Sequence, residues 1–146
     1  MAQIAEILEI KSRPVQTIGP DATVFETIRK MVDENIGSIV VADGEQIRGI
    51  FTERDYLRRI VLENRTSKTT RVAEVMTDNV ICADPHRSVE DCMAIMSQAR
   101  IRHLPVIDDG KLVGIVSIGD LVKFLSMERE IEIRYLTDYI SGRYPA

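Results

Sequence analysis

The sequence has no tryptophan, only two cysteines, and aromatic residues at 5% of its 146 positions. Cys82 and Cys92 alone cannot form a disulfide framework or a zinc site, and no apolar run approaches the ~20 residues that cross a bilayer. The first ten residues lack the cationic start and the cleavage site of a secretory signal. These absences predict a protein of a reducing compartment, in the cytoplasm, without a metal site or a membrane partner.

The sequence also lacks an excess of positive charge. It has 19 lysines and arginines against 23 aspartates and glutamates, a net charge of −4 with neutral histidines. Because duplex DNA and anionic membrane surfaces attract a basic field, neither is an expected partner. With 45% hydrophobic and 29% charged residues, the composition is that of a globular chain, and its length suits one domain or two small ones.

An internal repeat organises the chain. Gly49–Asp55 recurs as Gly114–Asp120, and aligning 15–63 with 80–128 without a gap gives 11 identical residues in 49 positions. About three identities would be expected from average composition. A shorter similarity, between 4–8 and 72–76, precedes each copy. The chain is therefore a duplication of one unit of about 65 residues.

Each copy has the pattern of a strand, a helix, two strands and a second helix. In the first copy we expect a strand at 15–18, a capping box of Thr23 and Glu26, and a hairpin turn at Asp43-Gly44. The second helix is expected to start at Thr52, and 64–70 to form a polar linker. The corresponding second-copy features are a strand at 80–83, a cap at Ser88 and Asp91, a turn at Asp109-Gly110 and a helix start at Ser117.

This order predicts an α+β fold. One copy alone would leave an apolar face uncovered, so we expect two β-α-β-β-α copies to pack about a pseudo-two-fold axis, with helices at both termini. The expected segments are 1–66, 67–128 and a helical tail at 129–146. Apolar residues recur at helical spacing in the tail and are expected to pack, within the chain or across a dimer: Ile131, Tyr135, Leu136, Tyr139 and Ile140.

The repeated motifs carry a family resemblance. The pattern Gly-hydrophobic-x-Thr/Ser-x-x-Asp occurs at Gly49–Asp55 and Gly114–Asp120, and Ile-Arg-His-Leu-Pro-Val occupies 101–106. With these motifs in register, residues 4–128 resemble a tandem pair of cystathionine-beta-synthase (CBS) domains, a Bateman module. The sequences at 52–57 and 67–71 are similar to those of stand-alone CBS-pair proteins, which have no attached enzyme.

Thr52-x-x-Asp55 and Ser117-x-x-Asp120 are placed at helix starts, where unpaired N–H groups carry partial positive charge. The carboxylate can accept both hydroxyls of a ribose, and the Thr or Ser hydroxyl can donate to a phosphate. The same residues are also good helix caps, worth ~1 kcal/mol each. A single motif would favour the cap, whereas two in register within the resembling module favour binding.

The resemblance implies adenosine-containing ligands, such as AMP, ADP, ATP, NAD(H) or S-adenosylmethionine, in two clefts built from both copies, with no required cofactor. In the first cleft, Thr52 and Asp55 would hold the ribose. The residues implied for the adenine and the phosphates are Ile81, Cys82, Ile101, Arg102, His103 and Pro105.

In the second cleft that the resemblance implies, Ser117 and Asp120 would hold the ribose. The other residues implied there are Thr17, Ile18, Ile36, Gly37 and Ser38. Gly37-Ser38 stands where the first cleft has Arg102-His103 and supplies no cation, so the charge would come from Arg54, Lys68 or Arg71. The two clefts are therefore expected to differ in ligand preference.

Three functions remain open. A regulatory module would bind nucleotides without chemistry and act on a separate effector protein; this is the function we expect, with no catalytic residue. An enzyme would use Asp55 or Asp120 as a base or Cys82 as a nucleophile, but the sequence shows no carboxylate dyad or metal-spaced cluster, and both cysteines are expected to be buried. A ligand-independent scaffold would act through its dimer surface alone. We also expect a homodimer.

Overall fold

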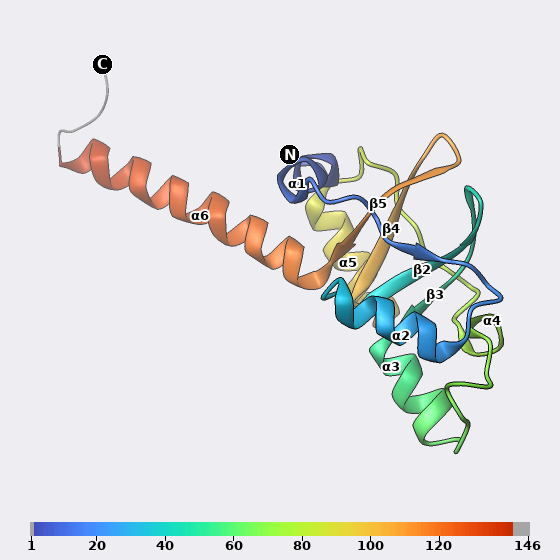
Figure 1. The fold of residues 1–146 in the computed structure, drawn as a ribbon. Helices are drawn as coiled ribbons and strands as arrows, with labels where there is room; N and C mark the ends of the chain where they lie inside the picture. Colours follow the sequence, from blue (N-terminus) through green and yellow to red (C-terminus); the bar gives the residue numbers. More distant parts are fainter. Residues whose placement is uncertain (1, 142–146) are drawn as a thin grey trace. The chain divides into compact units, whose positions relative to one another are not determined.

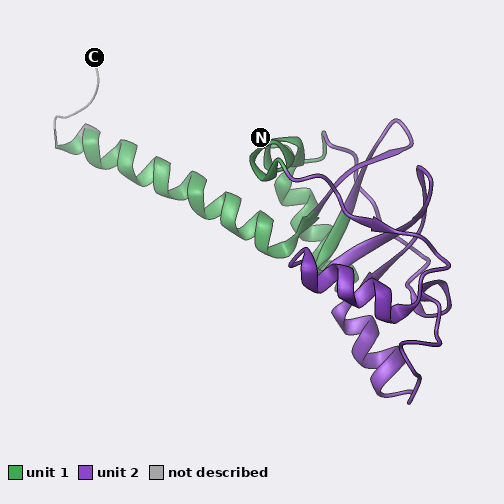
Figure 2. Ribbon diagram, viewed as in Figure 1, with its two compact units in different colours: residues 1–12, 86–104, 116–146 green, residues 13–85, 105–115 purple. Residues whose placement is uncertain are grey.

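The computed structural model describes residues 2–141, without the side chain of Tyr139. Helices and strands are mixed along the chain, which confirms the α+β class (Figure 1). Two compact units form, each from separate stretches of sequence: unit 1 from the described parts of 1–12, 86–104 and 116–146, and unit 2 from 13–85 and 105–115 (Figure 2). The expected segments 1–66, 67–128 and 129–146 and the pseudo-two-fold axis stay predictions, because the units follow spatial contacts rather than chain order.

Unit 2 is built on a three-stranded sheet. Strand β2 (Ser38–Asp43) pairs in parallel with the short β1 (Thr17–Ile18) and antiparallel with β3 (Gln46–Thr52). The helices of this unit are α2 (Val24–Asp33), α3 (Glu53–Tyr56), the π-helix η1 (Leu57–Val61) and α4 (Val72–Val75). One apolar cluster joins sheet and helices: Val24, Met31, Ile39, Val41, Phe51, Ile60, Val72 and Val75.

Unit 1 is mainly helical. Its helix α6 (Ile118–Ile140) contacts both α1 (Ile4–Lys11) and α5 (Val89–Ala99). Each of these helices contributes a fully buried apolar side chain, such as Ile4, Cys92 and Leu121. The second hairpin, β4 (His103–Asp108) with β5 (Lys111–Ser117), supplies residues to both units.

The strand expected at 80–83 is reduced to a single bridge between Ala83 and Val106. The Ala83 N–H donates to the Pro105 carbonyl at 3.0 Å, and the Ile107 N–H donates back to Ala83 at 2.9 Å. Extending this parallel ladder toward residue 81 would require an N–H from residue 105. Proline has none, whereas the first copy has Val40 at that position, so the strand that opens each copy forms only in the first copy, as β1.

The helix that precedes each copy packs at the start of the other copy's first helix. In unit 1 the Ile4 N–H donates to the Arg87 carbonyl at 3.0 Å, next to the N-cap of α5. In unit 2 the Val24 N–H donates to the Thr70 carbonyl at 2.8 Å, just before α4. The hydroxyl half of each predicted capping box is confirmed there, since Thr23 and Ser88 accept the N–H groups at the third helical position. The return bond from the Glu26 or Asp91 carboxylate is not found among the described contacts.

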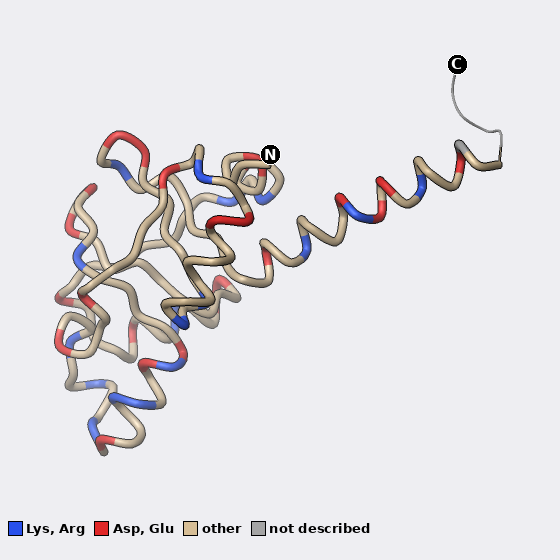
Figure 3. Tube along the Cα trace, turned by 180° about the vertical axis from the view of Figure 1, so that it is seen from behind, with Lys and Arg blue, Asp and Glu red and all other residues tan. Residues whose placement is uncertain are grey.

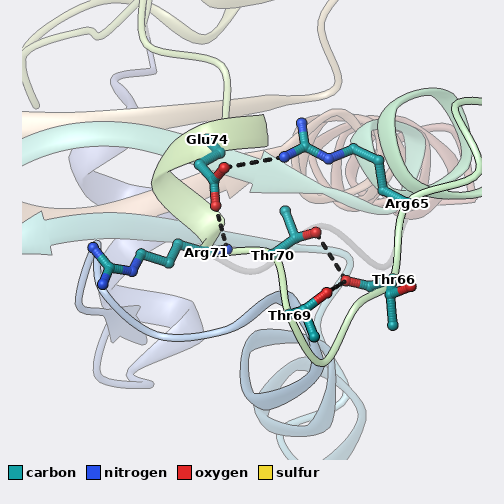
Figure 4. Close-up of polar contacts among 6 residues, drawn as sticks. All are labelled: Arg65, Thr66, Thr69, Thr70, Arg71 and Glu74. Carbon is teal, nitrogen blue, oxygen red and sulfur yellow. Dashed lines mark hydrogen bonds and ion pairs between the residues drawn. The ribbon is translucent and has the colours of Figure 1, made fainter.

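The linker expected at 64–70 is a structured loop that closes the start of α2 (Figure 4). The Thr70 hydroxyl donates to the Thr66 carbonyl at 2.8 Å. Glu74 accepts the Arg71 N–H at 2.8 Å and pairs with the Arg65 guanidinium at 3.1 Å. These bonds hold the loop in the conformation that presents the Thr70 carbonyl to α2.

The tail continues α6 without a break as far as Ile140. Ile131 is 68% exposed and Ile140 is 84% exposed, and charges of both signs are distributed along the helix (Figure 3). Ile131, Leu136 and Ile140 are therefore mostly exposed rather than packed within the chain, and the Tyr139 side chain lies outside the described residues. The alternative, packing across a dimer, stays a prediction.

A close backbone approach fixes the segment that follows α4. The N–H and carbonyl of Thr77 both bond to those of Ile50 in β3, each at 2.9 Å. A Cβ at the neighbouring Gly49 would lie 2.7 Å from the Thr77 carbonyl oxygen and 2.6 Å from Met76 Sδ. Only glycine therefore lets Met76 and Thr77 lie this close to β3.

We predict that Gly49→Ala lowers the free energy of unfolding by about 1–3 kcal/mol, because the added methyl group forces the Thr77 backbone away. Urea denaturation of both proteins measures this difference. Gly19→Ala is the matched control, since nothing lies within 4 Å of its Cβ position, and it should change stability little. Equal stability of the two variants would contradict the close approach.

Candidate functional site

Thr52 and Asp55 form a reciprocal cap where β3 passes into α3. The Asp55 N–H donates to Thr52 Oγ1 at 3.2 Å, and the Thr52 N–H donates to Asp55 Oδ2 at 3.0 Å. Asp55 is only 8% exposed. The capping interpretation of this motif is therefore confirmed, and we call these two residues the Asp55 corner.

Ser117 and Asp120, the Asp120 corner, repeat this geometry where β5 passes into α6. The Asp120 N–H donates to Ser117 Oγ at 3.0 Å, and the Ser117 N–H donates to Asp120 Oδ2 at 2.8 Å. The residue after the hydroxyl residue also has an equivalent backbone partner at each corner. The Glu53 N–H donates to the Gly37 carbonyl at 3.2 Å, and the Ile118 N–H donates to the Arg102 carbonyl at 2.9 Å. The duplication thus extends to individual hydrogen bonds.

The two corners differ in the side chain that reaches the carboxylate from outside the motif. The Thr77 hydroxyl lies 3.2 Å from Asp55 Oδ1 and 3.5 Å from Oδ2. The Lys11 ammonium lies 2.9 Å from Asp120 Oδ2. Both residues were missed by sequence reasoning, although each follows one of the two similar segments, 4–8 and 72–76, that precede the copies.

Charge surrounds the two carboxylates differently as a result. Partial burial acts to raise the pKa of Asp120, but the hydrogen bonds and charge of Lys11 and the Ser117 N–H outweigh it and lower that pKa. The side chains of Lys11 and Asp120 are 30% and 26% exposed, so solvent screens this ion pair only partly. The Asp120 corner therefore holds a paired charge, whereas the donor that reaches Asp55 is neutral.

The residues expected around the second ribose all lie in unit 2. Ser38 pairs with Thr52 across the β2–β3 ladder, and Gly37 accepts the Glu53 N–H. Thr17 and Ile18 form β1 beside β2, and Ile36 donates its N–H to the last turn of α2. The structure therefore brings Gly37 and Ser38 to the Asp55 corner, and their placement against Asp120 stays a prediction.

The residues expected for adenine and phosphates are divided between the units. Ile101, Arg102 and His103 lie in unit 1, where Arg102 adjoins the Asp120 corner. Ile81 and Cys82 are exposed in unit 2, and Pro105 is buried there beside Ala83. Contact of these residues with a ligand at Asp55 stays a prediction.

Cys82 is exposed, so the expectation that both cysteines are buried is wrong for this one. The strand expected at 80–83 forms only at Ala83, which leaves Cys82 outside the sheet. Desolvation nevertheless raises the pKa of its thiol, which keeps it protonated and a poor nucleophile at neutral pH. Cys92 is fully buried, as expected.

The cations considered for the second cleft have other contacts in unit 2. Lys68 Nζ lies 5.2 Å from the centre of the Phe25 ring, and the Arg71 guanidinium lies 3.7 Å from Asp21. Both contacts are at the N-terminal end of α2, whose ten residues rise about 15 Å. Lys68 and Arg71 are therefore distant from Gly37, which follows the other end of α2. Arg54 is exposed on α3.

Unit 2 also contains a hollow of about 490 Å³ between α2 and α3. Its lining is mostly apolar: Ile28, Met31, Val32, Asn35, Ile36, Gly37, Phe51, Glu53, Tyr56 and Leu57. Thr52 and Asp55 are not part of this lining, so we do not identify the hollow with the ribose-type site.

Among residues 2–141, no three acidic, histidine or cysteine side chains come together as metal ligands, and no helix has the length and apolarity to span a membrane.

The family follows from the repeats and their paired corners. A family model for the CBS domain matches the chain twice, at residues 5–62 and 72–127. The chain belongs to the CBS domain family. The two matches cover both corners, so this CBS pair carries the Gly-hydrophobic-x-Thr/Ser-x-x-Asp motif once in each domain.

Known CBS proteins are similar in sequence and structure. CBS domain-containing protein CBSX3 of Arabidopsis thaliana, named as mitochondrial, is 43% identical over 129 residues, which are 85% of this chain but only 63% of that protein. A solved protein with CBS domains from Burkholderia ambifaria is 46% identical, with a TM-score of 0.81 over 85% of this chain and 93% of that one. The CBS domain pair of protein MJ0100, solved with 5′-methylthioadenosine and S-adenosyl-L-methionine, is 26% identical, with a TM-score of 0.78 over 88% and 98%.

We predict that Lys11→Gln lowers the free energy of unfolding by about 1 kcal/mol at about pH 7. Because the folded-state pKa of Asp120 is lowered, the ion pair stabilises the fold above the ordinary pKa of aspartate, about 3.9, and this contribution disappears as the pH falls through the folded-state value. The difference between wild type and variant should therefore shrink toward about pH 3. Urea denaturation at both pH values measures it, with Lys123→Gln on the same helix as control; a difference independent of pH would contradict the ion pair.

Proposed function

We propose that this CBS pair is a regulatory module that binds adenosine-containing nucleotides, such as AMP, ADP, ATP or NAD(H), and modulates a separate effector protein. The observation that carries this proposal is the doubled corner, in which a helix start presents a fixed carboxylate in each domain. No chemistry on the ligand is part of the proposal. We propose a cytoplasmic location from the composition alone. The relatives do not support it, because the plant relative is named as mitochondrial.

The geometry of the corners suits a ribose. Each carboxylate already accepts the N–H of Thr52 or Ser117, which fixes its orientation without using all of its lone pairs. A vicinal diol can donate two hydrogen bonds to a carboxylate held in this way. The two ligands of the MJ0100 CBS pair share adenosine and differ in what the 5′ position carries. This supports adenosine as the common element for the present chain.

The phosphates of a nucleotide require donors or cations near the ribose. In unit 1, Arg102 is next to the Asp120 corner through its backbone, and Lys11 contacts the carboxylate itself. These two residues support the part of the proposal that concerns ligands with a 5′ phosphate. A ligand-independent scaffold remains the alternative, since both motifs also serve as helix caps.

We predict that an adenosine nucleotide at 100 times its Kd adds ~2.7 kcal/mol to the stability of the protein. Thermal unfolding with AMP, ADP, ATP and NAD, after removal of any co-purified ligand, measures the effect. Asp55→Asn and Asp120→Asn should each reduce it and together abolish it, whereas Asp21→Asn, at an exposed carboxylate, should not. The scaffold alternative would be supported if no adenosine compound stabilised the protein.

We also propose that the regulatory module is a homodimer, with a second copy covering the helices of unit 2. Val32 on α2 and Leu57 on η1 line the apolar hollow, yet they are 72% and 56% exposed. Burying such side chains against a second copy would contribute about 25 cal/mol for each Å² of apolar area removed from water. A hollow between two exposed apolar helix faces offers space for a partner's side chains.

We predict that wild-type protein sediments as a dimer and that Val32→Glu with Leu57→Glu shifts it to monomer, because two charges would be buried in the interface. Analytical ultracentrifugation measures the masses. Val113→Glu, at an exposed position on β5 outside both the hollow and the tail stripe, is the matched control and should leave the dimer intact. A monomeric wild type, or dissociation by Val113→Glu alone, would overturn this interface.

A further inference from the structure

The ion pair between Lys11 and Asp120 joins two parts of unit 1 that are 109 residues apart in sequence. Lys11 is the last residue of α1, and this helix is anchored by Ile4 and Ile7, which are almost completely buried. The packed helix therefore carries the Lys11 side chain to the carboxylate.

The carboxylate that Lys11 contacts is the one that a ribose would need. Oδ2 of Asp120 accepts both the Ser117 N–H, at 2.8 Å, and the Lys11 ammonium, at 2.9 Å. Because Oδ2 already accepts two donors, a ribose diol that bonds to both oxygens of this carboxylate would compete with the ammonium at Oδ2. If a neutral ligand displaces Lys11, a partly buried ammonium loses a charged partner, which opposes binding.

A ligand with its own negative charge changes this balance. A phosphate attached close to the ribose would give the displaced ammonium a new anionic partner while the diol takes the carboxylate. The long lysine side chain can move between two such partners without a shift of α1. The cost of opening the ion pair is then offset by an anionic ligand.

The Asp55 corner provides an internal comparison. Thr77 reaches its carboxylate with a neutral hydroxyl, at 3.2 Å from Oδ1. A neutral diol can replace a hydroxyl without leaving any charge unpaired, so this corner has no corresponding requirement. The geometry of the motif itself is the same at both corners.

We infer that Lys11 is a specificity-determining residue that makes the Asp120 corner select adenosine ligands carrying a 5′ phosphate, whereas the Asp55 corner accepts neutral adenosine. This inference rests on the proposed nucleotide binding and adds which corner takes which charge class. Selectivity is measured as the ratio of two dissociation constants at the Asp120 corner, that of adenosine divided by that of AMP. The inference predicts that this ratio is high when Lys11 is present.

Isothermal titration with adenosine and AMP tests the inference in full-length Asp55→Asn protein, in which only the Asp120 corner should bind. Lys11→Gln should lower the adenosine-to-AMP ratio about tenfold, by weakening AMP and strengthening adenosine, and Lys11→Arg should keep it high. Lys123→Gln removes the same charge from α6 three residues beyond Asp120, and it should leave the ratio unchanged. The inference is wrong if Lys11→Gln leaves the ratio unchanged or if Lys123→Gln lowers it equally.

The same titrations without the Asp55 substitution cover the case in which that variant does not fold. Two sites should then be resolved, and the Lys11→Gln effect should fall on the site that Asp120→Asn removes; an effect on the other site would overturn the inference. Failure of the wild type to bind any of adenosine, AMP, ADP, ATP and NAD would overturn the proposed function. Failure to bind adenosine and AMP while another of these compounds binds, or AMP binding that does not depend on Lys11, would overturn the inference alone.

Discussion

Reciprocal capping between a hydroxyl and a carboxylate is the interaction on which both halves of this structure depend. At Thr52–Asp55 and at Ser117–Asp120 it supplies partners for two N–H groups that a helix start would otherwise leave unpaired. The same contacts join each hairpin directly to its helix without an intervening loop. A polar pair at this position therefore gives a fixed carboxylate at a site of partial positive charge.

Local chemistry made much of the fold predictable. The caps at Thr23 and Ser88 and the glycine turns depend on neighbouring residues, so spacing alone identifies them. The turn of the first hairpin still lies one residue beyond the predicted Asp43-Gly44, since Gly44 and Glu45 form it, with Gly44 at φ 63°. The second turn is formed by Asp109 and Gly110 as predicted, at φ 51° and 76°. A one-residue shift is within what an Asp-Gly pair permits, because glycine accepts positive φ at either turn position.

What could not be predicted depends on contacts across the sequence. The short strand at 80–83 fails because of an N–H that Pro105 lacks, and that effect appears only when the pairing register is known. The partners of the two carboxylates, Thr77 and Lys11, come from segments that the motif does not include. Periodicity and spacing describe one element at a time, so neither contact has a local signature, although the similarity of 4–8 to 72–76 indicates that these segments have corresponding roles.

Capping also limits how two duplicated sites can diverge. Replacing Thr52 or Asp55 by a residue suited to another ligand would remove a cap as well, at about 1 kcal/mol for each helix start. Between the copies the capping pair has in fact changed only from Thr to Ser, which keeps the hydroxyl. Residues outside the two capped helices, α3 and α6, carry no such constraint. There the partners of the two carboxylates differ by a full charge, since Thr77 contacts Asp55 and Lys11 contacts Asp120. Because the capping hydroxyl and carboxylate must stay constant for the fold, discrimination between ligands must come from the residues around them.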